Sequence, residues 1–480
     1  MKVMLVTNKT TLGNKYGSNL DTVLNLMVQL NGHHKKINPE STLYYIDDAV
    51  SMKDIAPPVR DNNKAQTKAA VDAIFEKKKL DCMVLVGAGD IVAFQELKDP
   101  TDTTGLAVIQ SDLPYACAYP CSDDVRRFLA PERMVTRIPD VVNDAAEGKL
   151  VLENAVQQAM SPGKAAADYA GEPWAVCTQR RECALQGLLS LVYGAVKPYA
   201  TCPHSGPCWD PVTSYKRKVH AHILHGGVRS TFLGGESNGD PSVRYEAVHI
   251  DMVDAGLEDG VILLERACHG AQLFDPKECR KGKGLPLANA YLKRKAWAVI
   301  GSTTQNYSYE NAMHFSDFIV GYFGKYLLEP ETSIGAAFLA ARKQVIKDFG
   351  GAWDNFKLKI LAGMVVYGDA SKAVIEKVDK KEGTMAEESH AAASHVVPVE
   401  VRDARIPEGV KKQICDVLKR RGHDLEAAVS ASRLAVLKPG CEAADALGDN
   451  WQYYVRLDRK WLMFTTENGN VISVEEIEEG

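Results

Sequence analysis

Cys268 and His225 carry the strongest chemical signal in the sequence. Cys268 follows the apolar run 261–264, and Gly270 comes two positions after it. His225 ends a second apolar run, 220–224, and two glycines follow it. A thiol becomes a useful nucleophile when a nearby base favours the thiolate. Any one cysteine is more often a buried small hydrophobe, but the two motifs taken together predict nucleophilic catalysis by a cysteine–histidine pair.

The fold must bring these two residues together. Apolar runs of this length predict strands that are buried on both faces of a parallel sheet. The polar residues after each run mark the carboxyl end of the strand, and ligands bind at that edge in open α/β sheets. If the two strands are neighbours, His225 and Cys268 lie side by side at this edge. A glycine after the histidine can leave its backbone N–H facing an oxyanion.

Strand and helix patterns alternate through most of the chain. This alternation predicts an α/β fold with a parallel sheet. The predicted strands lie at 2–6, 42–45, 82–86, 174–178, 199–202, 220–224, 261–264 and 296–300. The predicted helices lie at 20–30, 68–78, 145–160, 183–193, 287–295, 312–327, 332–349 and 356–366.

Composition predicts where the chain divides. A first lobe spans 1–144 and ends before the helix-like segment 145–160, and a second lobe spans 145–378. Residues 379–398 are small and polar with few apolar anchors, as in a linker. Residues 399–480 form a small α+β domain of their own, with helical patterns at 410–421 and 425–432 and a hairpin whose arms are 451–457 and 461–465.

Charge and apolar content exclude several classes of protein. The net charge is −5, which offers no concentrated basic face for nucleic acid. No apolar run approaches the ~18 residues of a membrane span. The N-terminus predicts a first strand rather than a signal peptide. Eleven cysteines without a repeating spacing predict free thiols in a reducing, cytoplasmic environment, unless an export signal has been removed from a secreted protein.

Residues 224–226 (Leu-His-Gly) and 265–270 (Glu-Arg-Ala-Cys-His-Gly) resemble the catalytic signature of the caspase-like (clan CD) cysteine peptidases. Within that clan the sequence is most similar to the gingipains. Residues 122–140, 298–308 and 364–371 resemble three further gingipain segments, and all the matches run in order over residues 1–378. The pair of catalytic motifs is specific, and the other segments support it.

The resemblance implies a caspase-like sandwich, with a non-catalytic lobe at 1–144 beside a catalytic lobe at 145–378. It implies a cysteine endopeptidase, that is, a thiol protease, acting on a protein or peptide. Cys268 would attack the peptide carbonyl, His225 would protonate the leaving amine, and the N–H groups of Gly226 and Cys268 would hold the oxyanion. No cofactor is required, and calcium is allowed as a structural ion. Arg126, Arg127 and Phe128 replace the acidic loop of the gingipains.

Two loops supply candidates for the S1 pocket. A charged pocket is selective because a mismatched charge would be buried unpaired. The loop after strand 174–178 contains Arg181 and Glu182, with Arg180 beside them, and the loop 303–310 contains Tyr307 and Glu310. In caspases an arginine from a similar loop binds the aspartate before the cleaved bond, and in gingipains an acidic residue from a similar region binds an arginine there. We expect cleavage after lysine or arginine, selected by Glu310 or Glu182.

Two other functions compete with this one. In the first, His220, His222 and His225 bind zinc in a hydrolase, with Cys202, His204 and Cys208 close before them in sequence. Imidazole is the commonest zinc ligand, but His225 has the opposite parity on the strand. In the second, the protein is a regulated effector or adaptor that binds a partner through residues 399–480. The aromatic residues of this segment could form part of that interface, or they could pack into a small core of the domain itself.

Overall fold

The computed structural model describes residues 1–195, 197–201, 216–236, 244–307, 313–349, 353–376, 412–413 and 416, and the backbone of the strands between residues 429 and 478. The chain forms two compact units. The first contains Met1–Val345 and Asp354–Met385, and the second contains Ile346–Trp353 and Ala386–Gly480. Among the described residues, no helix combines the length and the apolar character needed to cross a membrane.

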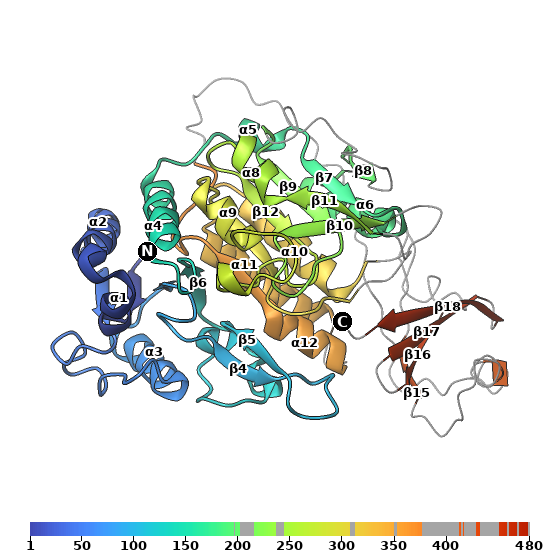
Figure 1. The fold of residues 1–480 in the computed structure, drawn as a ribbon, viewed down its shortest axis with the longest axis horizontal. Coiled ribbons are helices and arrows are strands. Elements are labelled where there is room, and N and C mark those ends of the chain that lie inside the picture. The colour runs from blue at the N-terminus through green and yellow to red at the C-terminus, as the bar shows by residue number, and fades with distance from the viewer. Residues whose placement is uncertain are drawn as a thin grey trace, which may run out of the picture. The chain divides into compact units, whose positions relative to one another are not determined.

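A sheet of ten described strands forms the centre of the first unit (Figure 1). Its order is β2-β1-β3-β6-β14-β13-β12-β9-β7-β8. Neighbouring strands are parallel except β13 and β14, which are antiparallel. The strands are β1 (Val3–Thr7), β2 (Thr42–Tyr45), β3 (Cys82–Val86), β6 (Met134–Ile138), β7 (Trp174–Cys177), β8 (Ala200–Thr201), β9 (Val219–Ile223), β12 (Ile262–Glu265), β13 (Ala298–Ser302) and β14 (Met364–Tyr367).

Two rows of helices flank this sheet. In one row α2 packs on α4, α4 on α9 and α9 on α8, and in the other α6 packs on α10 and α10 on α12. The predicted α/β fold with a caspase-like parallel sheet is confirmed. The helices are α1 (Lys9–Tyr16), α2 (Leu20–Ile37), α3 (Lys64–Lys78), α4 (Ala145–Met160), α5 (Ala166–Ala170), α6 (Glu182–Tyr193), α8 (Ile250–Gly256), α9 (Leu287–Lys293), α10 (Phe315–Leu327), α11 (Ile334–Asp348) and α12 (Asn355–Gly363).

Short antiparallel elements complete the fold. In the first unit β4 (Gln95–Lys98) pairs with β5 (Val108–Ser111), and β10 (Phe232–Glu236) pairs with β11 (Arg244–His249). In the second unit β15 (Val429–Ser432), β16 (Trp451–Leu457), β17 (Lys460–Glu467) and β18 (Asn470–Glu478) form one sheet. The predicted hairpin of 451–457 and 461–465 is therefore confirmed. The predicted helix at 425–432 is wrong over Val429–Ser432, and the predicted helix at 356–366 ends at Gly363, where β14 begins.

Arg137 on β6 holds the middle of the sheet together. Its buried guanidinium donates to both carboxylate oxygens of Asp112, at 2.9 and 2.6 Å, and to the carbonyls of Gly87 and Val92 at 2.8 Å. β14 pairs with β6 through Tyr367 and Arg137. The 122–140 segment that resembles gingipains thus contributes a structural residue where the two halves of the sheet meet.

Asp369, just after β14, ties this strand to α2. Its carboxylate lies 2.8 Å from Nε2 of His34, and both side chains are buried. Burial by itself would raise the pKa of Asp369, but His34 and the hydrogen bonds from Ser371 hold that pKa below its ordinary value. The 364–371 segment that resembles gingipains therefore also has a structural role, because it connects β14 to α2.

Candidate active site

The register of β9 and β12 brings the two predicted catalytic residues to the same level. The strands are parallel neighbours, and His222 lies opposite Glu265. The strands end at Ile223 and Glu265, and the same offset carried three residues beyond the last pair leads from His222 to His225 and from Glu265 to Cys268. Both residues stand just beyond the carboxyl ends of their strands, the edge where open α/β sheets bind ligands.

Gly226 brings the backbone after His225 into contact with Cys268. A Cβ atom built on Gly226 would lie 1.6 Å from the carbonyl oxygen and 3.2 Å from the nitrogen of Cys268. Backbone atoms cannot move aside as the end of a flexible side chain can. Only glycine allows this approach, so the position needs glycine for lack of space rather than for an unusual φ angle.

Replacing Gly226 by alanine should therefore separate His225 from Cys268. We expect kcat/KM to fall at least ~10²-fold, because small displacements of catalytic groups are costly, and stability to fall by about 1–3 kcal/mol through overpacking. Gly227→Ala is the matched control, since its Cβ would meet side-chain atoms of Lys281 and Ser230 at 3.3 and 3.4 Å. Equal activity of the two variants, measured beside thermal unfolding, would contradict this assignment.

A rigid turn presents Cys268. The carboxylate of Glu265 is buried, accepts the N–H of Ala267 at 2.7 Å and lies 3.1 Å from Nδ1 of His222. A Cβ atom on Gly270 would come within 2.4 Å of Cγ of Glu265, which explains the glycine two residues after the cysteine. His269 adopts a φ of 55°, so the chain reverses sharply after Cys268.

The backbone of Asn306 forms two hydrogen bonds with the thiol of Cys268. Its backbone N–H donates to Sγ of Cys268 at 3.2 Å, and its carbonyl accepts from the thiol at 3.1 Å. Its side-chain amide donates to the carbonyl of Arg266 at 3.0 Å. The guanidinium of Arg266 is in turn fixed by Asp317 at 2.6 Å and by the carbonyl of Tyr307. The segment after β13 thus positions the turn that carries Cys268.

The thiol of Cys268 is poised for activation by a base. Burial raises its pKa above the ordinary value, while the Asn306 N–H and then the charges of Arg266, Lys359 and Arg181 act in the opposite direction. Since the net shift is upward, the thiol is protonated at neutral pH. A neighbouring base must therefore remove this proton before the sulfur can attack.

Glu236 contacts Nε2 of His225 and is the main site residue that the sequence analysis missed. Glu236 lies on β10, and this strand is joined to the histidine by two backbone hydrogen bonds between His225 and Gly234, at 2.9 and 2.7 Å. The Glu236 side chain is 7% exposed and that of His225 is 32% exposed. Nε of Arg180 lies 3.9 Å from the second carboxylate oxygen. A buried carboxylate in this position orients the ring and stabilises the imidazolium form.

The proposed oxyanion donors are available. Within the described part of the chain, the backbone N–H groups of Gly226 and Cys268 donate no hydrogen bond. The amides on either side of Cys268 are occupied, because Ala267 donates to Glu265 and His269 donates to the carbonyl of Thr304 at 2.9 Å. Two unoccupied N–H groups beside a nucleophile are what a tetrahedral oxyanion requires.

The S1 candidates lie in different settings. Arg181 ends the short 3₁₀ helix Gln179–Arg181, and its charge acts on the thiol of Cys268. Glu182, the next residue, accepts a hydrogen bond from the hydroxyl of Tyr199 at 3.3 Å. Tyr307 is buried, with its hydroxyl 3.2 Å from Nζ of Lys359. Glu310 lies outside the described residues.

Two histidines of the zinc hypothesis are packed as core side chains. His220 and His222 are buried and both rings pack against Trp174. Nδ1 of His220 lies 2.9 Å from the hydroxyl of Tyr291, and Nδ1 of His222 faces Glu265. No group of three His, Cys, Asp or Glu side chains in the described ranges is arranged to hold a metal ion. Cys202, His204 and Cys208 lie outside those ranges.

The segment where gingipains have an acidic loop is bound by its own neighbours. Asp123 pairs with Lys98 at 2.9 Å, and Asp124 accepts the N–H of Arg126 at 3.0 Å as the N-cap of the 3₁₀ helix Val125–Phe128. Phe128 is buried. These interactions explain how the loop keeps its shape with two arginines and a phenylalanine in it.

A comparison with solved structures finds a likeness in fold. A complex of the pro- and mature domains of RgpB from Porphyromonas gingivalis matches over 100% of both chains, with a TM-score of 0.50 and 12% sequence identity. A structure described as a protease matches over 100% of this chain and 97% of its own, with a TM-score of 0.46 and 12% identity. No protein-family model and no curated protein matches the sequence. At this identity the RgpB likeness concerns the fold alone.

Proposed function

We propose that this protein is a cysteine endopeptidase in which Cys268 is the nucleophile and His225 the general acid and base. The observation that carries the proposal is that both residues follow neighbouring parallel strands, β9 and β12, at the same edge of the sheet. There Gly226 contacts the backbone of Cys268. Glu236 on Nε2 of His225 and two unoccupied N–H groups support the same reaction.

The proposed mechanism assigns each proton. Because Glu236 occupies Nε2, Nδ1 of His225 takes the thiol proton, and the sulfur of Cys268 bonds to the carbonyl carbon of the peptide. The N–H groups of Gly226 and Cys268 hold the oxyanion. His225 then gives its proton to the leaving amine as the C–N bond breaks, which leaves a thioester. A water molecule, deprotonated by His225, hydrolyses that thioester and restores the thiol.

We further propose a protein or peptide substrate with lysine or arginine at P1, the residue before the cleaved bond. The loop of Arg181 and Glu182 supports a charged S1 pocket, since Arg181 acts on the Cys268 thiol and Glu182 is its neighbour in sequence. The acid of Glu182, with Glu310, would select the basic side chain. Arg181 is the residue that would instead select an acidic one.

A panel of fluorogenic peptides that differ only at P1 tests this specificity. We expect kcat/KM for lysine or arginine to exceed that for alanine by at least ~10²-fold, because a charged pocket leaves buried groups unpaired with the wrong side chain. Glu182→Gln should reduce that ratio, while Glu153→Gln on α4 should not change it. Preferential cleavage after aspartate or glutamate would refute the basic P1 and point to Arg181.

A further inference from the structure

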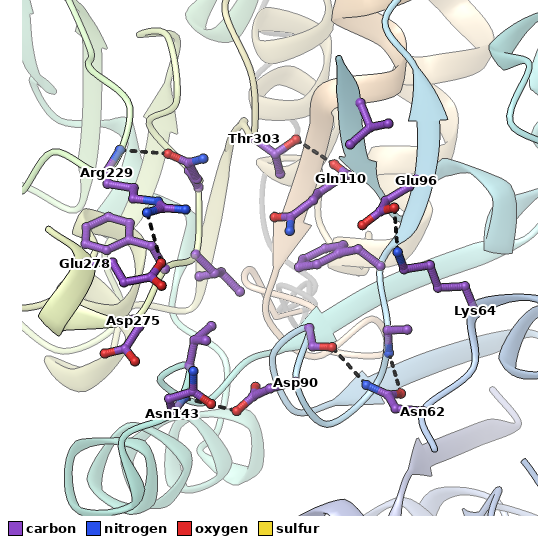
Figure 2. Close-up of a pocket in the computed structure, with 18 of the residues that line it drawn as sticks. Asn62, Lys64, Asp90, Glu96, Gln110, Asn143, Arg229, Asp275, Glu278 and Thr303 are labelled. Carbon is purple, nitrogen blue, oxygen red and sulfur yellow. Dashed lines mark hydrogen bonds and ion pairs between the residues drawn. The ribbon is translucent and has the colours of Figure 1, made fainter. Parts of the chain in front are cut away.

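A cavity of about 530 Å³ begins beside the nucleophile (Figure 2). His269, the residue directly after Cys268, lines it together with Thr303 and Thr304. Asp90 and Asn143, which follow β3 and β6, line it from the first part of the sheet. Its size lies within the ~300–1,000 Å³ of typical ligand pockets. A chain bound at Cys268 therefore has a polar pocket within reach.

His269 gives this cavity a neutral wall. Nδ1 of the ring lies 3.3 Å from the carbonyl oxygen of Thr303. Burial lowers the pKa of His269 to about 4, so the ring carries no charge at neutral pH. A carbonyl oxygen can only accept, so Nδ1 holds the proton and Nε2 is left as an acceptor. The ring therefore does not repel a cation, and it is a poor base for the Cys268 thiol.

The charges around the cavity are unequal. Five carboxylates and two cations line it, the cations being Lys64 and Arg229. Each cation already has a partner, since Lys64 pairs with Glu96 at 2.5 Å and Arg229 with Glu278 at 3.0 Å. Figure 2 shows these two pairs on opposite sides of the cavity. Three lining carboxylates remain: Asp61, Asp90 and Asp275.

The positive charge close to these three carboxylates does not balance their negative charge. Asp90 pairs with Lys15 at 2.8 Å, but the same ammonium lies 2.6 Å from Asp140. Asp61 and Asp275 form no ion pair within the described part of the chain; the carboxylate of Asp275 accepts only the N–H of Lys277. The cavity therefore carries a surplus of negative charge. Asp90 and Asp275 are half-buried, so solvent screens their charges less than that of Asp61, which is exposed.

We propose that this cavity is a second specificity subsite, which binds a lysine or arginine side chain of the substrate at a position other than P1. The proposal rests on the peptidase function, because it takes the substrate to be a chain held at Cys268. A long basic side chain carries the positive charge that Asp61 and Asp275 lack, and its N–H groups can donate to these carboxylates and to Nε2 of the neutral His269.

Binding to the inactive Cys268→Ala variant tests the subsite without any reaction. The probes are fluorescein-labelled octapeptides with a fixed P1 lysine, in which each other position is alanine, lysine or glutamate in turn. We expect one position at which lysine binds about tenfold more tightly than alanine, the effect of one charge-assisted hydrogen bond. Fluorescence anisotropy gives the dissociation constants.

Two substitutions should remove that preference in the same background. Asp61→Asn and Asp275→Asn keep the local backbone, because asparagine tolerates the positive φ of Asp61 and caps a helix as well as aspartate does. The combined variant should lower the lysine advantage to about twofold or less. Glu76→Gln, on the exposed far end of α3, is the control and should leave the advantage unchanged.

The outcomes separate the two proposals. A lysine advantage that persists after both substitutions, or no position at which lysine binds better than alanine, would overturn the subsite. Failure of the peptidase proposal shows elsewhere, as equal turnover by wild type and Cys268→Ala. In that case the anisotropy data still decide whether the cavity binds a basic side chain.

Discussion

Cys268→Ala should lose at least ~10⁴-fold in kcat/KM against the best peptide of the panel, the loss that follows removal of a catalytic nucleophile. The reason is specific to this thiol. Its sulfur forms hydrogen bonds with the backbone N–H and carbonyl of Asn306. Beside it are the N–H groups of Gly226 and Cys268, which donate no hydrogen bond to any described residue. Without it no thioester can form, and only the oxyanion site and substrate binding remain.

The control for this loss is another cysteine. Cys121 is exposed, and its thiol contacts only the side chain of Gln95 among the described residues. Cys121→Ala should therefore keep wild-type kcat/KM. Alanine at 268 also removes little packing, so both variants should unfold within a few degrees of wild type. Cleavage by Cys268→Ala at the wild-type rate would eliminate the cysteine mechanism altogether.

Glu236→Gln should lower kcat by about 10²-fold or more while KM changes little, as loss of an orienting carboxylate does in related triads. The amide keeps the shape of the side chain but cannot stabilise the imidazolium of His225. His225→Ala should cost more, because the base itself is gone. Steady-state kinetics on one peptide compare the variants.

A double mutant separates orientation from general damage. If Glu236 acts only through His225, then Glu236→Gln combined with His225→Ala should be no slower than His225→Ala alone, because residues that act as one unit are not additive. Glu246→Gln, an exposed carboxylate on the partner strand β11, is the matched control and should keep full activity. Additive losses would show that Glu236 supports the fold rather than the histidine.

Local patterns were sufficient for most of the central sheet. β2 and β3 have the predicted bounds, and the other predicted strands differ by one or two residues at their ends. β14 was missed because the last turn of α12, residues 360–363, and β14 form one apolar stretch with only Gly363 at their junction. Periodicity does not separate a buried helix from a buried strand in such a stretch.

The proposed catalytic pair could be predicted from the sequence, and the residues that support it could not. His225 and Cys268 could be predicted because each follows an apolar strand pattern and is itself followed by a glycine within two residues. Glu236 depends on β10 turning back to pair with His225, which is a tertiary contact. Asn306 acts mainly through its backbone N–H and carbonyl, and any residue type supplies those. The signal for Glu236 was an acid at the end of an apolar strand soon after the histidine, a weak pattern on its own.

The position of β14 has a consequence for how the protein is made. β14 lies between β6 and β13, yet it is the last of the described strands of the first unit to leave the ribosome. Until residue 367 is available, β6 and β13 are both open strand edges, and such edges invite pairing with other chains. The nascent chain can build its two half-sheets separately, but they join only when this strand enters between them. Early termination before residue 364 would thus yield an aggregation-prone chain even though His225, Glu236 and Cys268 had all been synthesised.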